Sequence, residues 1–507
     1  MNNKLSESNV ASFHIGKNSY LGELKLNGRD TLLRIWGDTR ETSVIGHNLP
    51  EQIHASLNDL TKVSLIGIHN GGGGTISKLQ QDKSYHNRHY CKIHPEFVLY
   101  GNRYINHKER CFESLHLFFN HSTVLFNDDE AFNDIIHAKK EVVKNLILKD
   151  LETSEELYGF KRSDREITVG EYPNISLFTG SFEIHSFDSP YGRIEIQNCP
   201  QTTRASSKGY SLTNRASCTI HFSKPLSLEE ADEKVAPLLS VFELILGKKL
   251  KIDDYQLSVK SEAEFPEFID VYRCIDKNSC SENEDEEPHL GQPLIKVKHN
   301  PYEFENVVNK WISSHVAWQD SRWQFFGSFT ETTYTTDRLI KVANMFDIVP
   351  DEAYEKKVAL TCELIEAKQK AKSIFKNLPP SMERDSILGA LGRIGTMSLK
   401  HKIRDRVSII NKVKPGLVAG IELVTDQSVD CRNHFVHGGN RKFDYYNNFN
   451  LVCFFITTLE FVYGASSLIE LGWDIERWCQ EPSINHPFNL YLESYAVNLD
   501  RLKSVAA

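Results

Sequence analysis

Residues 417–439 read LVAGIELVTDQSVDCRNHFVHGG and combine an amphipathic helix pattern with a polar cluster at its end. Apolar residues recur from Leu417 to Phe435 at spacings that place them on one helical face. The Gly438-Gly439 pair that follows is typical of a helix end, because glycine adopts a positive φ at little cost. The segment therefore predicts a bundle helix that carries Arg, Asn and His side chains at its C-terminal end.

The residues on both sides of this segment also show helical periodicity. Upstream, one pattern runs from 351 to 375 and ends before Pro379-Pro380, which cannot continue a helix. Downstream, residues 445–471 form a nearly all-apolar run that ends at Gly472. Helices with short connections are typical of an antiparallel bundle, so we expect an all-α C-terminal domain.

The most apolar stretch, residues 451–469, is almost long enough to span a bilayer. Thr457, Thr458 and Glu460 lie near its centre, and no basic residue flanks it directly. We therefore expect a buried bundle helix and no membrane partner. The first residues lack the apolar core of a secretory signal, and ten cysteines without a C-x-x-C pair are typical of reduced thiols. These features predict a cytoplasmic protein.

The first half of the chain has a different pattern. Short runs rich in β-branched and aromatic residues, such as 62–68 and 218–222, alternate with turn signals such as Gly71–Gly74. Many short strands with such punctuation predict one or two β-sandwiches. One helix is expected among them, at residues 228–246.

An acidic segment separates the two halves. Residues 279–293 contain five acidic residues and few apolar ones, which is typical of a linker. We therefore expect an α+β multidomain protein. It has a β-rich, sandwich-like N-terminal domain or domains at 1–278, an acidic linker at 279–295 and an all-α helical domain at 296–507.

Arg432, Asn433 and His437 suit the cleavage of RNA without a metal, in which the 2′-hydroxyl attacks the adjacent phosphorus. A histidine with a pKa near ~6.5 can take or give that proton near neutral pH. An arginine can stabilise the charge that develops on the phosphorane oxygens, and an asparagine can orient it. Asn433 and His437 share a face if the helix continues that far, with Phe435 packed into the core. A capped helix end without chemistry is the alternative.

An arginine, then a polar residue, then a histidine at this distance in a helical bundle resembles the signature of the HEPN ribonuclease superfamily. More narrowly, the R-N-H-F-V-H-G-G motif of 432–439, behind a β-rich domain and an acidic linker, resembles the Apea-like HEPN proteins of bacterial abortive-infection defence. Residues 22–28, GELKLNG, are similar to the start of the N-terminal domain of that family.

The resemblance implies Arg432, Asn433 and His437 as active-site residues, and His434 has no role in its pattern. It further implies a homodimer or higher homo-oligomer with a composite site, an RNA substrate with tRNA as the leading candidate, and a toxin that a phage-derived trigger activates. The N-terminal domain would then be a sensing or regulatory domain. No cofactor is expected.

A basic stretch at 400–414 is a candidate RNA-binding surface. Its positive charges stand out in a chain with a net charge of −9, and Asp405 is the one acid among them. A solvated helix face is the alternative. The candidate residues are Lys400, Lys402, Arg404, Arg406, Lys412 and Lys414.

Two weaker signals favour structural roles. His86, His89, Cys91 and His94 could ligate zinc, but a His-rich loop beside a sheet is the preferred interpretation, so no metal is predicted. The aromatic residues between 311 and 326 have helix-like spacing and are expected to be core rather than base-stacking platforms.

Two other functions remain open. The chain could be a non-catalytic RNA- or protein-binding adaptor that dimerises through its helical domain. It could also be an antitoxin-type partner of a separate catalytic subunit. Neither alternative needs chemistry at Arg432 and His437.

Overall fold

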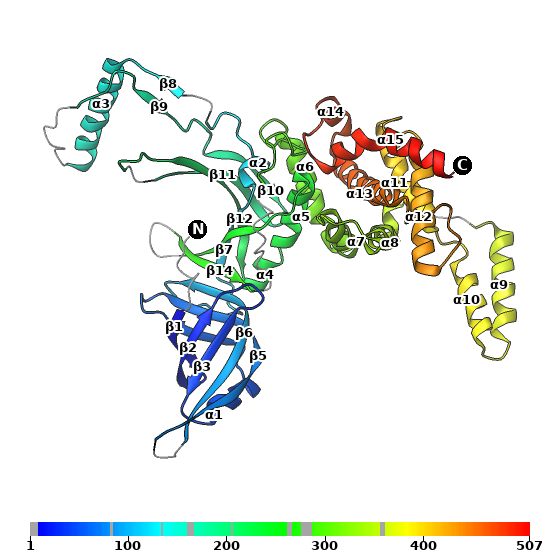
Figure 1. Cartoon of the computed structure of the whole chain (residues 1–507), viewed down its shortest axis with the longest axis horizontal. Helices are drawn as coiled ribbons and strands as arrows, with labels where there is room; N and C mark the ends of the chain where they lie inside the picture. The colour runs from blue at the N-terminus through cyan, green and yellow to red at the C-terminus, as the bar shows by residue number, and fades with distance from the viewer. Residues whose placement is uncertain are drawn as a thin grey trace. The chain divides into compact units, whose positions relative to one another are not determined.

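The structure is a computed structural model that describes residues 9–81, 85–132, 135–159, 167–203, 206–260, 266–274, 286–354 and 360–506. Its contacts divide the chain into two units (Figure 1). The first unit contains residues 1–231 and 251–284, and the second contains 232–250 and 285–507. Residues 279–285 of the expected acidic linker lie outside the described residues, and residues 286–295 are irregular.

Within the described residues, the first unit is built on one antiparallel sheet of twelve strands. The strand order is β10-β11-β12-β7-β13-β14-β6-β3-β2-β1-β4-β5. The strands are β1 (Asn9–Ile15), β2 (Asn18–Lys25), β3 (Leu32–Gly37), β4 (Gln52–Ser56), β5 (Lys62–Leu79), β6 (Tyr85–Gly101), β7 (Phe112–Phe119), β10 (Glu183–Ser189), β11 (Gly192–Thr202), β12 (Leu212–Leu226), β13 (Ile252–Val259) and β14 (Glu267–Arg273).

Strands β1 to β6 close into a barrel, because β6 pairs with β3 on one side and with β5 on the other. Alternate residues point inward and form an apolar core that includes Phe13, Leu33, Ile53 and Leu65. Further along, β6 also pairs with β14, so the same strand leads from the barrel into the open part of the sheet. The predicted β-rich N-terminal region is confirmed, but its strands join one continuous sheet rather than two facing sheets, because β6 is shared.

Smaller elements complete the first unit. They are α1 (Glu41–Val44), α2 (Ser122–Leu125), α3 (Lys140–Tyr158), α4 (Leu228–Asp232) and the two-stranded sheet of β8 (Ile135–His137) and β9 (Asn174–Ser176). The helix expected at 228–246 is divided into α4 and a second helix, α5, whose contacts assign it to the second unit.

The second unit is helical, as predicted for the C-terminal region. Its helices are α5 (Val235–Leu246), α6 (Pro301–Ser313), α7 (His315–Phe329), α8 (Thr336–Asn344), α9 (Cys362–Lys376), α10 (Met382–Arg393), α11 (Leu399–Val413), α12 (Ile421–His437), α13 (Phe449–Leu471), α14 (Ile475–Gln480) and α15 (Pro487–Ala506).

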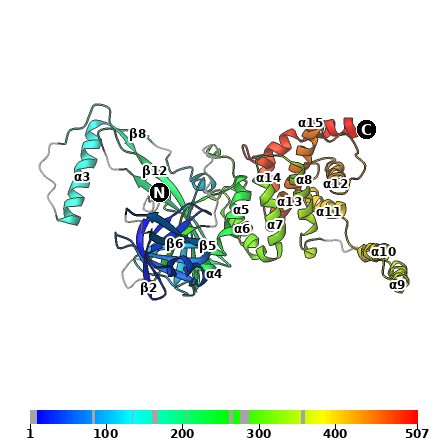
Figure 2. The same cartoon turned by 60° about the horizontal axis from the view of Figure 1, so that its bottom comes forward.

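Helix α13 is the centre of this unit and contacts α7, α8, α11, α12 and α15 (Figures 1 and 2). Among the described residues it is the one helix long and apolar enough to cross a membrane, but 83% of its most apolar window is buried inside the protein. Its polar residues have partners in the bundle, since Glu460 pairs with Arg338 and Ser466 accepts a hydrogen bond from Arg406. These pairings suit a core helix.

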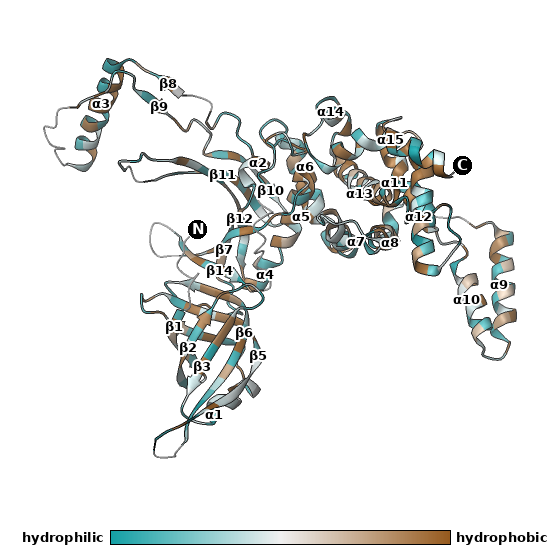
Figure 3. Ribbon diagram, viewed as in Figure 1, coloured by the Kyte–Doolittle hydropathy of each residue, from teal (hydrophilic) through white to brown (hydrophobic). Residues whose placement is uncertain are grey.

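The helix expected from 351 to 375 begins later than predicted. A short 3-10 turn occupies 351–353, residues 355–359 lie outside the described part of the chain, and α9 begins at Cys362. The start is set by Thr361, whose hydroxyl accepts the backbone N–H of Leu364. Helix α9 pairs with α10, and both mix hydrophilic and hydrophobic residues along their length (Figure 3).

Candidate active site at the end of helix α12

Helix α12 continues to His437. Asn433 and His437 therefore share a helical face, as predicted for a helix of this length. It ends there because Gly438 has a φ of +70° and donates its N–H to the carbonyl oxygen of His434. The His434 ring secures the same turn, with Nδ1 donating to the Gly439 carbonyl oxygen at 2.6 Å. His434, which has no role in the motif, therefore stabilises the turn after the helix.

The body of α12 is buried against α8, α11 and α13. Val424, Ser428 and Cys431 lie in the core, and burial raises the pKa of the Cys431 thiol to about 12. The prediction that Phe435 faces the core is wrong. Its ring is only partly buried and lies against Tyr445 and Tyr446, because the last turn of α12 extends beyond the packed interior.

The last turn brings the three predicted active-site residues together around one guanidinium. Arg432 Nη1 donates to Asn433 Oδ1 at 3.0 Å and lies 3.5 Å from His437 Nε2. Because arginine has no acceptor, this contact requires Nε2 to accept, which places the imidazole proton on Nδ1. Arg432 is partly buried and His437 is exposed, so the cluster opens to solvent at the histidine.

A fourth residue, Asn344, completes the cluster. Its Oδ1 accepts hydrogen bonds from Arg432 Nε at 3.2 Å and from Nη2 at 2.6 Å. Asn344 is the last residue of α8 and lies 88 positions before Arg432 in the chain. Sequence reasoning missed it, since an asparagine at a helix end carries no signal that names a partner so distant.

Helix α8 is held in place by a buried ion pair. Arg338 Nη2 donates to both oxygens of Glu460 on α13, at 3.0 and 3.1 Å, and Ser328 Oγ donates to the same carboxylate at 2.5 Å. Burial raises the pKa of the Glu460 carboxyl, and the Arg338 guanidinium opposes that shift. Paired in this way, the two charges fix α8 on α13 and so position Asn344.

The basic stretch behaves differently, because most of its charges are paired within the protein. Lys400 Nζ lies 2.7 Å from Asp430, and Arg404 binds Asp426, so two ion pairs join α11 to α12. Lys402 Nζ contacts Asp347, at 2.9 Å from its carbonyl oxygen and 3.6 Å from its carboxylate.

Arg406 is the most deeply buried of these basic residues. Its side chain is fully buried, with Nη1 2.6 Å from the Glu470 carboxylate and Nε donating to Ser466 at 3.0 Å. Burial excludes Arg406 from contact with RNA phosphates. Lys412 and Lys414 lie at the end of α11, with Lys412 exposed and Lys414 partly buried.

The possible zinc ligands lie in strand β6 rather than in the expected loop. Cys91 points into the barrel core, while His89 Nδ1 bonds Thr75 and His94 Nδ1 bonds the Thr31 carbonyl. His86 pairs with Lys78 near the beginning of the strand. The extended strand separates these residues, and no group of three or more His, Cys, Asp or Glu side chains in the described chain could hold a metal ion.

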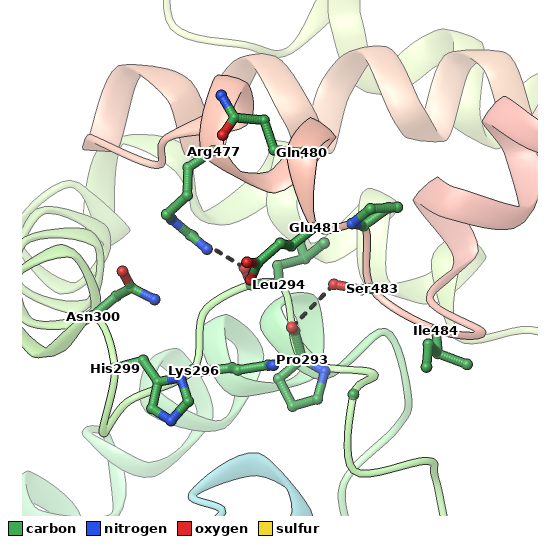
Figure 4. A pocket seen from close by; sticks show the side chains of 12 residues that line it. Pro293, Leu294, Lys296, His299, Asn300, Arg477, Gln480, Glu481, Ser483 and Ile484 are labelled. Carbon is green, nitrogen blue, oxygen red and sulfur yellow. Dashed lines mark hydrogen bonds between the residues drawn. The ribbon is translucent and has the colours of Figure 1, made fainter.

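A cavity of about 330 Å³ lies elsewhere in the helical unit, between residues 291–300 and 477–484 (Figure 4). Its polar groups largely bind one another. Arg477 donates to the Leu294 carbonyl and pairs with Glu303 at 2.9 Å, and Ser483 donates to the Pro293 carbonyl. These bonds connect residues 293–303 to α14 and the loop after it, and Arg432 does not line this cavity.

The fold and the site define a two-part protein, with a β-rich unit and a helical unit that presents an Arg-Asn-His cluster at a helix end. Residues 11–311 match the family model described as ApeA N-terminal domain 1, and residues 340–477 match the one described as Apea-like HEPN. The first match alone spans more than half of the chain, so the chain belongs to the ApeA family. No curated protein and no solved structure matches it.

The second match includes Asn344 and the whole end of α12. HEPN families generally consist of nucleases that act on RNA, and the two matches together support an HEPN-type effector of anti-phage defence.

Proposed function

We propose that this protein is a metal-independent endoribonuclease that acts as an anti-phage abortive-infection effector. The observation that carries the proposal is the Arg432 guanidinium, which Asn344 and Asn433 hold 3.5 Å from the exposed His437 imidazole. A fixed cation beside a titratable group is the pair that phosphodiester cleavage by an internal hydroxyl requires.

In this mechanism His437 Nε2 accepts the proton of the 2′-hydroxyl as that oxygen attacks phosphorus. The developing negative charge lies on the non-bridging oxygens, where Arg432 stabilises it. Because Nη1 and Nε2 are 3.5 Å apart, Nη1 can donate to a phosphate oxygen while Nε2 accepts from the adjacent 2′-hydroxyl. The bond between phosphorus and the 5′-oxygen breaks, and that oxygen takes a proton from the protonated His437 or from water, which gives a 2′,3′-cyclic phosphate and a 5′-hydroxyl.

The proposal extends to the organisation of the chain. Residues 1–278 form a sensing or regulatory domain for a phage-derived trigger, residues 279–295 a linker and residues 296–507 the ribonuclease domain. The active form is a homodimer or higher oligomer in the cytoplasm, and its substrate is an RNA, with tRNA as the leading candidate.

The basic residues that contact this RNA are proposed to be fewer than the sequence suggested. Lys412 and Lys414 remain candidates because they lie at the end of α11. Lys400, Lys402 and Arg404 would have to leave carboxylates of their own domain. Arg441 and Lys442, which are exposed and follow the helix end closely, are added to the set.

The test is an RNA-cleavage assay with the purified full-length protein in EDTA, followed by analysis of the RNA ends. We expect His437→Ala and Arg432→Ala each to lower the cleavage rate by about 100-fold or more. His401→Ala, at an exposed histidine on α11, is the matched control and keeps the parental rate. Cleavage that survives both changes at the site would contradict the proposal.

A further inference from the structure

A second cavity in the helical unit adjoins the Arg432 cluster. It has a volume of about 420 Å³, is open to solvent, and is lined by Trp323, Gln324, Asp337, Ile340, Lys341 and Asn344. Asn344 belongs both to the lining of this cavity and to the Arg432 cluster, because its Oδ1 accepts hydrogen bonds from Arg432. One side chain therefore forms the wall between this cavity and the candidate active site.

Trp323 gives the cavity an exposed aromatic surface. It lies on α7, where Phe325 and Phe329 are buried, yet 80% of its own surface is exposed. The expectation that the aromatic residues of this region are core is confirmed for Trp311 and Phe325 but is wrong for Trp323, which lies on the outer side of the helix. An exposed indole beside a cavity is a surface on which a planar ring can stack.

The polar groups of the cavity suit a nucleobase. Gln324 lines the cavity, and its side-chain oxygen is buried and accepts no hydrogen bond from the residues that the structure describes, so a turn of the side chain towards the cavity would let it accept one from a ligand. At the rim of the cavity, Lys341 bonds the Gly327 carbonyl and pairs with Glu331 at 3.3 Å.

We infer that this cavity binds a base of the RNA substrate next to the scissile phosphate. The base stacks on Trp323 and donates an N–H to Gln324, while its phosphate reaches Arg432 and His437 on the other side of Asn344. Stacking on an aromatic ring requires an unpaired base, so the substrate is a single-stranded loop or end. This inference rests on the proposed function and specifies its substrate as single-stranded RNA.

The experiment measures the binding of short, fluorescently labelled single-stranded RNA to the full-length His437→Ala protein by anisotropy. In that background we expect Trp323→Ala to weaken binding about tenfold, the typical effect of losing one stacked base. Trp323→Phe should keep most of the affinity, because it keeps an aromatic face. Tyr302→Ala, at a residue that is 84% exposed and lies outside the cavity, is the matched control and should bind like the parent.

A second variant tests the hydrogen bond. Gln324→Leu keeps the stacking surface but removes the acceptor, so we expect it to reduce the discrimination among the four homopolymeric RNAs more than it reduces the mean affinity. Equal affinities of Trp323→Ala and its parent would overturn the inference, as would a parent that binds no single-stranded RNA.

The outcomes separate this inference from the proposed function. If the native chain cleaves RNA but Trp323→Ala does not change RNA binding, the base site is contradicted and the proposed nuclease function stands. If Trp323→Ala weakens RNA binding but the native chain does not cleave RNA, the base site stands and the proposed nuclease function is contradicted. Loss of binding together with a smaller sedimenting species, not restored by Trp323→Phe, would show that Trp323 belongs to a subunit contact, and would overturn the inference.

Discussion

Two polar segments of the helical unit, the last turn of α12 and the basic face of α11, have different fates in the fold. Both stand out in the sequence as clusters of charged or titratable groups. On α11, Lys400 and Arg404 are bound to carboxylates of α12, and Arg406 is buried. At the end of α12, Arg432 is held by neutral amides instead, and no acid among the described residues pairs with it. The group that binds a charged side chain therefore indicates a functional site better than the presence of the charge does.

The strongest test of this contrast exchanges arginine for lysine in both segments. Lysine keeps the charge but cannot make the fork of hydrogen bonds to Asn344 and Asn433. We expect Arg432→Lys to lower RNA cleavage by about 100- to 1,000-fold, with folding intact by circular dichroism. Arg404→Lys is the matched change on α11 and should leave the rate within about twofold. Similar losses of cleavage in the two variants would show that Arg404 and Arg432 do not differ in their contribution to the reaction.

The next largest effect concerns stability. Arg406→Leu leaves the buried Ser466 hydroxyl without its donor and part of the buried guanidinium's space unfilled, and it removes the pair with the partly exposed Glu470, so we expect the free energy of unfolding to fall by about 2 kcal/mol. Arg404→Leu breaks a pair that is largely exposed and should cost about 1 kcal/mol or less. Urea unfolding followed by circular dichroism gives both values. An Arg406 variant as stable as the Arg404 variant would show that burial does not separate them.

The effect of burial can also be tested at a histidine, His486. His486 is fully buried, with Nε2 bonded to the Leu244 carbonyl, and burial lowers its pKa to about 3. The unfolded chain therefore binds a proton below a pH of ~6.5 that the folded chain does not, and stability falls by about 1.4 kcal/mol per pH unit from there down to the folded pKa. At about pH 5 this group should contribute a loss of about 2 kcal/mol relative to neutral pH.

His486→Gln removes this titration. The variant should lose less stability than the parent between neutral pH and about pH 5 when urea unfolding is compared at the two values. An identical pH dependence in the two proteins would assign the acid sensitivity to other groups.

The smallest effect concerns RNA binding. Neutralising the exposed Arg441 and Lys442 by glutamine should lower the slope of log affinity against log salt by about 0.7 for each phosphate contact that is lost. Neutralising Lys400 and Arg404 in the same way should leave the slope unchanged. A reduced slope in the α11 variant would restore α11 as the RNA-binding surface.

Local signals in the sequence predicted the end of α12 well. Gly438 marked the helix terminus, and the spacing of Arg432, Asn433 and His437 placed their side chains together. The sequence could not supply Asn344 or the burial of Arg406, because these depend on partners 88 and more than 60 positions away. Such pairings are decided when helices pack, and helical periodicity does not encode them.

The β-rich half shows the same limit. Alternating patterns predicted strands, but the arrangement of the sheet depends on β6, a strand of 17 residues that pairs with β5 along its length and with both β3 and β14. Nothing in a local pattern distinguishes a long shared strand from two shorter strands in separate sheets. The sequence therefore indicated the class of the fold and left the connection between barrel and open sheet to the structure.

The closure of the barrel has a consequence for partners of the first unit. In the strand order of the described residues, β5 returns to β6, which leaves β10 as the one strand with a neighbour on only one side. An extended peptide can therefore join this sheet through main-chain hydrogen bonds beside Glu183–Ser189.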